Sequence, residues 1–150
     1  MTAVDVPLRP YRAEDEDAAI ALWRRAWQQT YPAIDFGARL AWWRTRWRDE
    51  IVPACAIVVA ERGREMIGFV TVNRDSGYLD QIVVAPEDWG GDVAGRLLDE
   101  TRRLSSAPLH LHVNTDNARA IRFYKKHGFF IAGEDVNPQS GRPVYVMRAR

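Results

Sequence analysis

Apolar residues recur at three- and four-residue steps along the first third of the chain, which is the spacing of a helix with one buried face. One run opens at about Ala13, with acidic residues in its first turn, and continues to about Thr30. A second run covers about 36–48. The apolar positions of the two runs are Ile20, Trp23, Trp27, Tyr31, Leu40, Trp43 and Trp47. We expect a short extended segment over 4–10 and then a hairpin of two helices, closed by Pro53.

The middle of the chain alternates apolar runs with turn residues, a pattern that predicts strands. Residues 56–61 and 65–72 flank an Arg-Gly-Arg turn and predict a β-hairpin, and 78–84 predicts a third strand. Pro86 ends that strand, a glycine-containing loop follows it, and 93–104 has helical spacing. This segment is therefore expected to form a strand, a loop and a helix.

The last third of the chain continues the alternation of strands and helices. It predicts a strand over 109–113, a helix over 117–127 that stops at Gly128, and two strands over 129–136 and 143–148. In order, the elements predict an α/β fold, with one mixed sheet and helices on both of its faces.

Composition and charge narrow the possible functions. The chain has 150 residues, 47% of them hydrophobic, which predicts one domain over 1–150. Lys+Arg 21 against Asp+Glu 20 leaves a net charge of +1, which disfavours nucleic acid as a partner. The single cysteine, Cys55, excludes an intramolecular disulfide and a cysteine-built metal site. The longest mainly apolar stretch, 51–60, reads as a core strand with its lead-in and is too short to span a membrane. No leader pattern is visible, so we expect a cytoplasmic protein without a membrane partner. We also expect a monomer or a homodimer.

The loop after Pro86 leads into a helix, an arrangement that offers free main-chain N–H groups to an anion. Arg96 and Leu97 follow Gly95, whereas a P-loop needs Lys and then Ser or Thr after its second glycine. Asp92 stands where a dinucleotide-binding loop needs glycine. Neither of these phosphate-binding motifs fits the chain.

Two segments together fit another pattern. The first is 84–98, which contains the loop Trp89-Gly90-Gly91-Asp92, and alone it is a weak signal. The second is 113–129, in which Asn117, an alanine, Tyr124 and Gly128-Phe129 follow one another at characteristic spacings. In this order and at this separation, the segments resemble the pyrophosphate loop and the Asn, Ala, Tyr, Gly-Phe segment of the GCN5-related N-acetyltransferase (GNAT) family.

The resemblance implies the GNAT acyltransferase fold, with acetyl-CoA as co-substrate between two splayed parallel strands. The pantetheine amides would pair with the main chain at Ile82, Val83 and Val84, and the pyrophosphate would contact the amides from Gly90 to Gly95. The residues implied for acetyl-CoA are Ile82, Val83, Val84, Trp89, Gly90, Gly91, Asp92, Val93, Ala94, Gly95, Asn117 and Tyr124.

Two residues of the loop depart from the family pattern. Asp92 stands where the family usually has glycine, and Trp89 where it usually has Gln or Arg. A carboxylate about 8 Å from a pyrophosphate would cost roughly 0.5 to 2 kcal/mol. Aspartate is also a good N-cap, so Asp92 is expected to bond the amide of Ala94 or Gly95. This departure keeps open an alternative function, an acyl-CoA-binding sensor or partner protein with little turnover.

Acetylation of an amine needs a base for the amine and an acid for the departing thiolate. Tyr124 falls where the family has its proton donor to the CoA sulfur, although it also reads as a core tyrosine. For the base, His112 and Asp80 compete, with water as a third possibility, and histidine has an ordinary pKa suited to the task. Asn117 matches the family's CoA-contacting asparagine and equally suits the N-cap of the last helix.

The first two helices usually wall the acceptor site in this family. Helical spacing explains most of the tryptophans here as core packing, and Trp27 and Tyr31 are the candidates for contact with the acceptor. The chain is thus expected to be an acetyl-CoA-dependent N-acetyltransferase acting on a primary amine, in a small molecule or at a peptide N-terminus. The amine is expected to attack the thioester directly in a ternary complex, without a metal ion.

Overall fold

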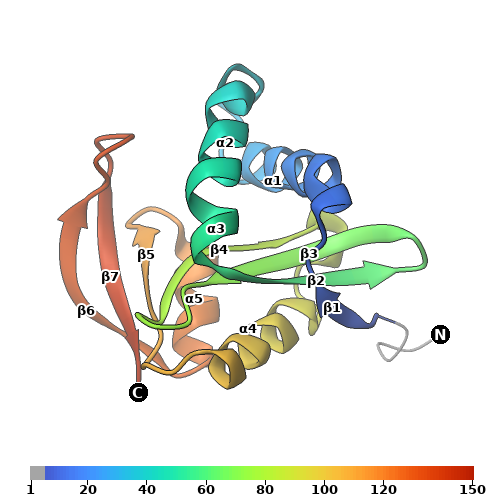
Figure 1. The fold of residues 1–150 in the computed structure, drawn as a ribbon. Coiled ribbons are helices and arrows are strands. Elements are labelled where there is room, and N and C mark those ends of the chain that lie inside the picture. Colours follow the sequence, from blue (N-terminus) through green and yellow to red (C-terminus); the bar gives the residue numbers. More distant parts are fainter. Residues whose placement is uncertain (1–5) are drawn as a thin grey trace.

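A computed structural model describes residues 6–150, in which seven strands form one mixed sheet. The strand order is β1-β2-β3-β4-β5-β7-β6, and every neighbouring pair is antiparallel except β4 and β5 (Figure 1). The strands are β1 (Leu8–Pro10), β2 (Ala56–Arg62), β3 (Glu65–Val72), β4 (Tyr78–Val84), β5 (His110–Asn114), β6 (Phe129–Val136) and β7 (Pro143–Ala149).

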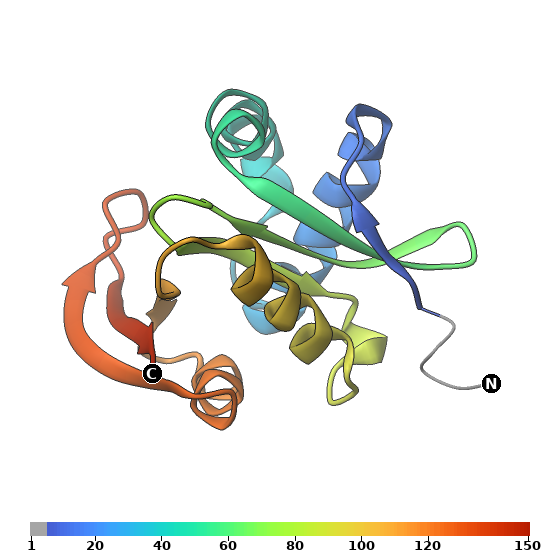
Figure 2. The same ribbon diagram turned by 60° about the horizontal axis from the view of Figure 1, so that its bottom comes forward.

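Helices cover both faces of the sheet. The helices are α1 (Glu16–Thr30), α2 (Leu40–Arg46), α3 (Val52–Ala54), α4 (Val93–Leu104) and α5 (Ala118–Lys126). Three 3-10 turns, Ala13–Asp15, Gly37–Arg39 and Pro86–Asp88, and a π-helical turn, Trp47–Ile51, join or precede them. The two views place α1, α2 and α3 on one face and α4 and α5 on the other (Figures 1 and 2). The predicted α/β fold with a mixed sheet is confirmed.

The largest differences from the predicted boundaries lie before β2, whereas several later boundaries differ by a single residue. The helical region passes through Pro53 and ends at Ala54, so 51–54 is helical and only the part from Ala56 onward is a strand. Pro53 is tolerated because it lies in the first turn of α3, where its missing N–H is not needed. Of the extended segment expected over 4–10, only Leu8–Pro10 is a strand, and residues 4 and 5 lie outside the described part of the chain.

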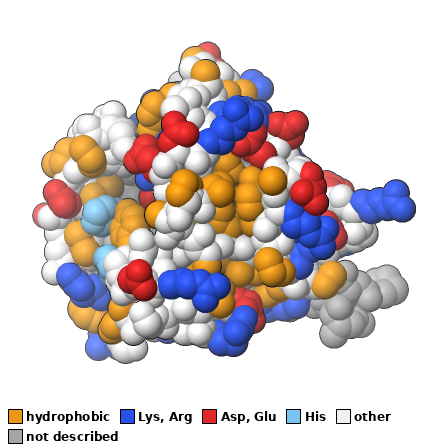
Figure 3. Space-filling model, in the orientation of Figure 1, with side chains coloured by type: hydrophobic (Ala, Val, Ile, Leu, Met, Phe, Trp, Pro, Cys, Tyr) orange, Lys and Arg blue, Asp and Glu red, His pale blue; other side chains and the backbone are white. Residues whose placement is uncertain are grey.

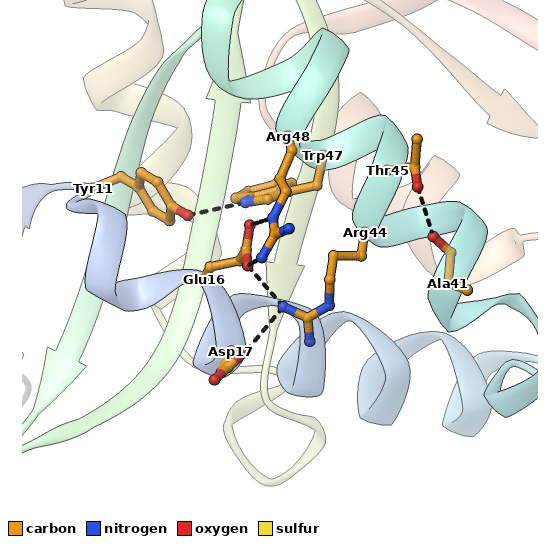
Figure 4. Close-up of polar contacts among 8 residues, drawn as sticks. All are labelled: Tyr11, Glu16, Asp17, Ala41, Arg44, Thr45, Trp47 and Arg48. Atoms are coloured by element: carbon orange, nitrogen blue, oxygen red, sulfur yellow. Dashed lines mark hydrogen bonds and ion pairs between the residues drawn. The ribbon is translucent and has the colours of Figure 1, made fainter.

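The two N-terminal helices are held together by aromatic packing and by ion pairs. The rings of Trp23 on α1 and Trp43 on α2 stack with centroids 4.6 Å apart, and both are buried. Glu16 accepts hydrogen bonds from Arg44 at 2.8 Å and from Arg48 at 2.6 Å, and Tyr11 accepts one from buried Trp47 at 3.0 Å (Figure 4). The interpretation of most tryptophans as core residues therefore holds for Trp23, Trp43 and Trp47.

The parallel strands β4 and β5 stay together only at their beginnings. Tyr78 pairs with His110 and Leu79 pairs with Leu111, and no later residue of β4 has a partner on β5. Meanwhile β4 remains paired with β3 as far as Val84, with a register shift after Thr71. The two strands therefore separate along their length, as the resemblance implies, and one edge of β4 is left without a strand.

Candidate functional site

The free edge of β4 carries the main-chain groups of alternate residues. Ala85 donates its N–H to Ile67 on β3, and in an antiparallel pair the residues that face the partner strand alternate. Val83 therefore faces β3, whereas Ile82 and Val84 turn their N–H and C=O groups toward the opening. The expected pairing of pantetheine with Val83 is corrected, because the main chain of Val83 is used by β3.

One of these free groups already has a partner. The indole Nε1 of Trp89 donates a hydrogen bond of 2.8 Å to the carbonyl oxygen of Val84. Trp89 comes from the loop before α4, so this bond fastens that loop to the end of β4. The expectation that Val84 offers its carbonyl to pantetheine is modified accordingly. By the register with β3, both main-chain groups of Ile82 and the N–H of Val84 point toward the opening, where β4 has no strand partner within residues 6–150.

The glycine loop leads directly into α4. Gly90 adopts φ +86°, a conformation that favours glycine, and no other atom lies near the position that its Cβ would take. Gly95 instead lies against the ring of His127, which a Cβ would approach to 3.0 Å, so its small size is explained by helix packing. The expected capping bond is absent: Asp92 is the N-cap residue of α4, but its side chain accepts no capping hydrogen bond and is exposed.

Tyr124 lies on α5, on the same face of the sheet as α4. Only 8% of the residue is exposed, and its ring meets that of Phe129 edge to face at 5.5 Å. Within residues 6–150 its hydroxyl makes no hydrogen bond, so it is available to a ligand. Burial raises the pKa of this hydroxyl, and the positive charge of Arg119 opposes the rise. Asn117 caps α5, because its side chain accepts a hydrogen bond from the N–H of Ala120 at 3.3 Å.

The opposite face carries a cluster that sequence reasoning found only in part. The ring of Tyr78 lies near those of His110 and His112, at centroid distances of 5.3 and 5.5 Å. Its hydroxyl is 3.4 Å from Nδ1 of His112, and burial raises its pKa to about 12. Histidine side chains reach the surface over β5, beside hydrophobic ones (Figure 3). The parallel pairing of Tyr78 with His110 creates this cluster, and no local pattern in the sequence reveals it.

Asp80, one of the two candidate bases, is held by an arginine. Arg46 on α2 donates to both carboxylate oxygens of Asp80, at 2.9 and 2.6 Å. The side chain of Asp80 is only 10% exposed. Both carboxylate oxygens of Asp80 therefore already accept charge-assisted hydrogen bonds. Nearby Cys55 is poorly suited to attack the thioester, because burial raises the pKa of its thiol to about 11.

Trp27 and Tyr31, at the end of α1, reach both of the separating strands. Trp27 donates to Gln81 on β4 at 3.3 Å, and Tyr31 accepts a hydrogen bond from Asn114 on β5 at 3.1 Å. Their rings stack at 6.0 Å. The hydroxyl of Tyr31 also donates to Asp116 at 2.7 Å, which sequence reasoning missed. The end of α1 therefore bridges β4 and β5 on the face opposite Tyr124.

A small hollow of about 180 Å³ opens next to this bridge. Its lining is Asn114, Thr115, Asp116, Arg142 and Pro143. Among the described residues, no group of three or more potential metal ligands occurs, and no helix is long and apolar enough to cross a membrane.

Comparison with known proteins places this geometry in a family. The family model described as "Acetyltransferase (GNAT) family" matches residues 16–129, which is most of the chain. The chain belongs to the GNAT acetyltransferases. The resemblance drawn from the two sequence segments is thereby confirmed.

Named acetyltransferases are similar to this chain over different lengths. Peptidyl-lysine N-acetyltransferase YjaB from Escherichia coli (strain K12) is 30% identical over 140 residues, covering 92% of this chain and 91% of that protein. Mycothiol acetyltransferase from Brachybacterium faecium is 33% identical over 91 residues, but these cover 53% of this chain and 28% of that protein. Both relatives are acetyltransferases with different acceptors.

Solved structures share the GNAT fold. The crystal structure of PaiA N-acetyltransferase from Thermoplasma acidophilum in complex with coenzyme A has a TM-score of 0.76 at 19% identity, with 100% of this chain and 99% of that chain covered. The solution structure of the apo form of E. coli YjaB has a TM-score of 0.73 at 24% identity, covering 95% and 96% of the two chains. These likenesses confirm the fold of the sheet and its helices.

Proposed function

We propose that this GNAT protein transfers an acetyl group from acetyl-CoA to a primary amine by direct attack in a ternary complex. The observation that carries the proposal is the separation of β4 from β5 after two residue pairs. The hydroxyl of Tyr124, which makes no hydrogen bond to the described residues 6–150, lies on one face of this opening, and the bridge formed by Trp27 and Tyr31 lies on the other. A donor thioester and an amine entering from opposite faces would meet between the strands.

The donor would bind along the free edge of β4. Ile82 has an unpaired N–H and C=O at this edge and Val84 an unpaired N–H, a set that suits the amides of a pantetheine arm. The loop from Trp89 to Gly95 and the start of α4 then suit the pyrophosphate. A coenzyme A thioester is further supported by the structural relative that was crystallised with coenzyme A.

Separate groups would handle the two protons of the reaction. Tyr124 would protonate the departing thiolate, and Arg119 would ease this step by opposing the rise in the pKa of its hydroxyl. His112, exposed on β5 and in contact with Tyr78, is favoured over ion-paired Asp80 as the base for the amine, directly or through water. The raised pKa of Cys55 argues against an acyl-enzyme.

The acceptor would approach along the end of α1. Trp27 and Tyr31 offer aromatic surface, and Asp116 offers a partly exposed carboxylate beside them, a combination that suits a cationic amine. The relative that covers the chain almost completely is named a peptidyl-lysine N-acetyltransferase. A lysine side chain in a peptide is therefore the first acceptor to test, followed by free peptide N-termini and small amines.

Release of free thiol from acetyl-CoA, measured with a panel of lysine peptides, peptides with free N-termini and polyamines, tests the proposal. We expect turnover that depends on an amine. Mass spectrometry should then locate the acetyl group on the nitrogen of that amine. Tight binding of acetyl-CoA without turnover on any amine would favour the sensor function that Asp92 leaves open. Absence of acetyl-CoA binding would overturn both.

A further inference from the structure

Arg119 and Trp89 form a contact between the two segments that carry the family pattern. Cζ of Arg119, near the start of α5, lies 3.7 Å from the centroid of the Trp89 ring, in the loop before α4. The ring face attracts the positive charge of the guanidinium. The contact therefore holds a cation directly beside the glycine loop.

The ring is itself fixed in place. Its Nε1 bonds to the carbonyl of Val84 at 2.8 Å, which ties the ring to the end of β4 and restricts its rotation. Arg119, in contrast, is exposed, and within residues 6–150 no oxygen accepts from its guanidinium and no carboxylate lies within ion-pair distance. A guanidinium has five N–H donors, and a π-face provides no lone pair for them. Arg119 is thus a positioned cation whose donors are unused.

We propose that Arg119 binds the diphosphate of the acyl-CoA donor and that Trp89 positions it to do so. This inference rests on the proposed function, because the donor is the ligand. Arginine recognises phosphate oxygens through two parallel N–H bonds, and a stacked guanidinium loses little further freedom when it forms them. The family usually has Gln or Arg at the position of Trp89, so here α5 supplies the cation and the loop supplies its support.

This assignment also explains how the loop can tolerate Asp92. The Asp92 carboxylate is exposed and makes no capping bond, so its charge is not neutralised by the helix amides. A cation on the neighbouring helix start would offset its repulsion of the diphosphate. The charge of Arg119 also opposes the rise in the pKa of the Tyr124 hydroxyl, so the two side chains are close enough to interact.

Calorimetric titration of the full chain with CoA and with 3′-dephospho-CoA tests the proposal. The variants are Arg119→Met, Arg119→Lys and Trp89→Ala, with Arg122→Met as matched control, because Arg122 is an exposed arginine one turn further along α5. We expect Arg119→Met to weaken binding of both ligands about 10- to 100-fold, the effect of losing charge-assisted hydrogen bonds. The affinity of Arg119→Lys should fall between those of the native chain and Arg119→Met. Arg122→Met should change binding by less than about twofold.

A double-mutant cycle tests the positioning role of Trp89. If Trp89 acts through Arg119, Trp89→Ala should weaken CoA binding in the native background and have little further effect in the Arg119→Met background. Equal losses in both backgrounds would overturn this role. Unchanged binding by Arg119→Met, or a loss seen with CoA but not with dephospho-CoA, would overturn the diphosphate assignment alone. If the native chain binds neither ligand, both the diphosphate assignment and the proposed function are overturned.

Discussion

Arg46 on α2 donates to both carboxylate oxygens of Asp80, at 2.9 and 2.6 Å, and thereby fastens the helical hairpin to the strand that borders the opening. The side chains are 17% and 10% exposed, so the pair is largely removed from water. The pair forms where the β3–β4 register shifts next to Asp80. The ion pair with Arg46 therefore gives Asp80 a structural role at the site.

Replacing Asp80 tests this interpretation through stability. Asp80→Asn would leave the Arg46 guanidinium largely buried without its counter-charge, so the free energy of unfolding should fall by about 3 kcal/mol. Glu87→Gln is the control, because Glu87 pairs with Arg25 where both side chains are about half exposed, and its loss should stay below about 1 kcal/mol. Urea unfolding measures both variants. Equal losses would contradict the structural role of Asp80.

Much of the fold could be predicted from the sequence because its signals are local. The ranges expected for β3, β4, α4 and β6 match the structure residue for residue, since turns or glycines bound each of them. The continuation of the helical region through Pro53 could not be predicted in this way. It depends on the π-helical turn Trp47–Ile51, whose buried Trp47 packs against Phe69 of β3.

The candidate site was predicted less completely, because its contacts join distant segments. Tyr124, Asn117 and the glycine loop follow from local spacing. The bond from Trp89 to Val84 and the pair of Asp80 with Arg46 do not, because each depends on how elements pack. The direction of main-chain groups is equally hard to predict. The resemblance implies that Val83 pairs with the donor, whereas its register with β3 indicates that its main-chain groups face β3.

Tyr124 is expected to affect turnover much more than donor binding. Tyr124→Phe removes a hydroxyl that makes no hydrogen bond within residues 6–150, so folding should be little changed. Loss of a general acid should lower turnover by roughly 10- to 1000-fold, because water can replace it in part. Tyr11→Phe is the control, since its hydroxyl accepts a hydrogen bond from Trp47, in the turn that follows α2. Steady-state kinetics with acetyl-CoA titration would exclude Tyr124 as the acid if turnover were unchanged.

Cys55 is expected to be unreactive near neutral pH. Burial raises the pKa of its thiol to about 11, so at pH 8 only about one molecule in a thousand carries the thiolate. Iodoacetamide should modify the folded chain about 100-fold more slowly than the urea-unfolded chain, with the rate still rising above pH 10. Cys55→Ala should keep its turnover within about twofold. Rapid alkylation, or loss of turnover in the variant, would reopen an acyl-enzyme route.

His112 is expected to set the acidic limb of the rate profile. If it accepts the amine proton, the rate should rise with pH, and His112→Gln should abolish that rise. His110→Gln is the control on the same face of the sheet, and it should leave the rise in rate in place. Burial lowers the pKa of His110, so its own titration would lie below the ordinary pKa of a histidine. A rise that persists in His112→Gln would assign the proton to water or to Asp80.

Asp92 offers a test of the loop's electrostatics that does not depend on catalysis. Its side chain is exposed and caps nothing, so Asp92→Gly should change the free energy of unfolding by only a few tenths of a kcal/mol. Removing a carboxylate from the approach to a diphosphate should tighten acetyl-CoA binding by up to about tenfold. Because salt screens such repulsion, the gain should shrink between 50 mM and 500 mM salt.

Asp92→Asn separates the charge of Asp92 from the shape of its side chain. If repulsion explains the gain, the asparagine form should bind acetyl-CoA nearly as tightly as the glycine form, with the same salt dependence. A gain confined to glycine would instead indicate that the side chain obstructs the loop. Equal or weaker binding by both forms would show that Asp92 points away from the donor, and the reason to consider a low-turnover sensor would then disappear.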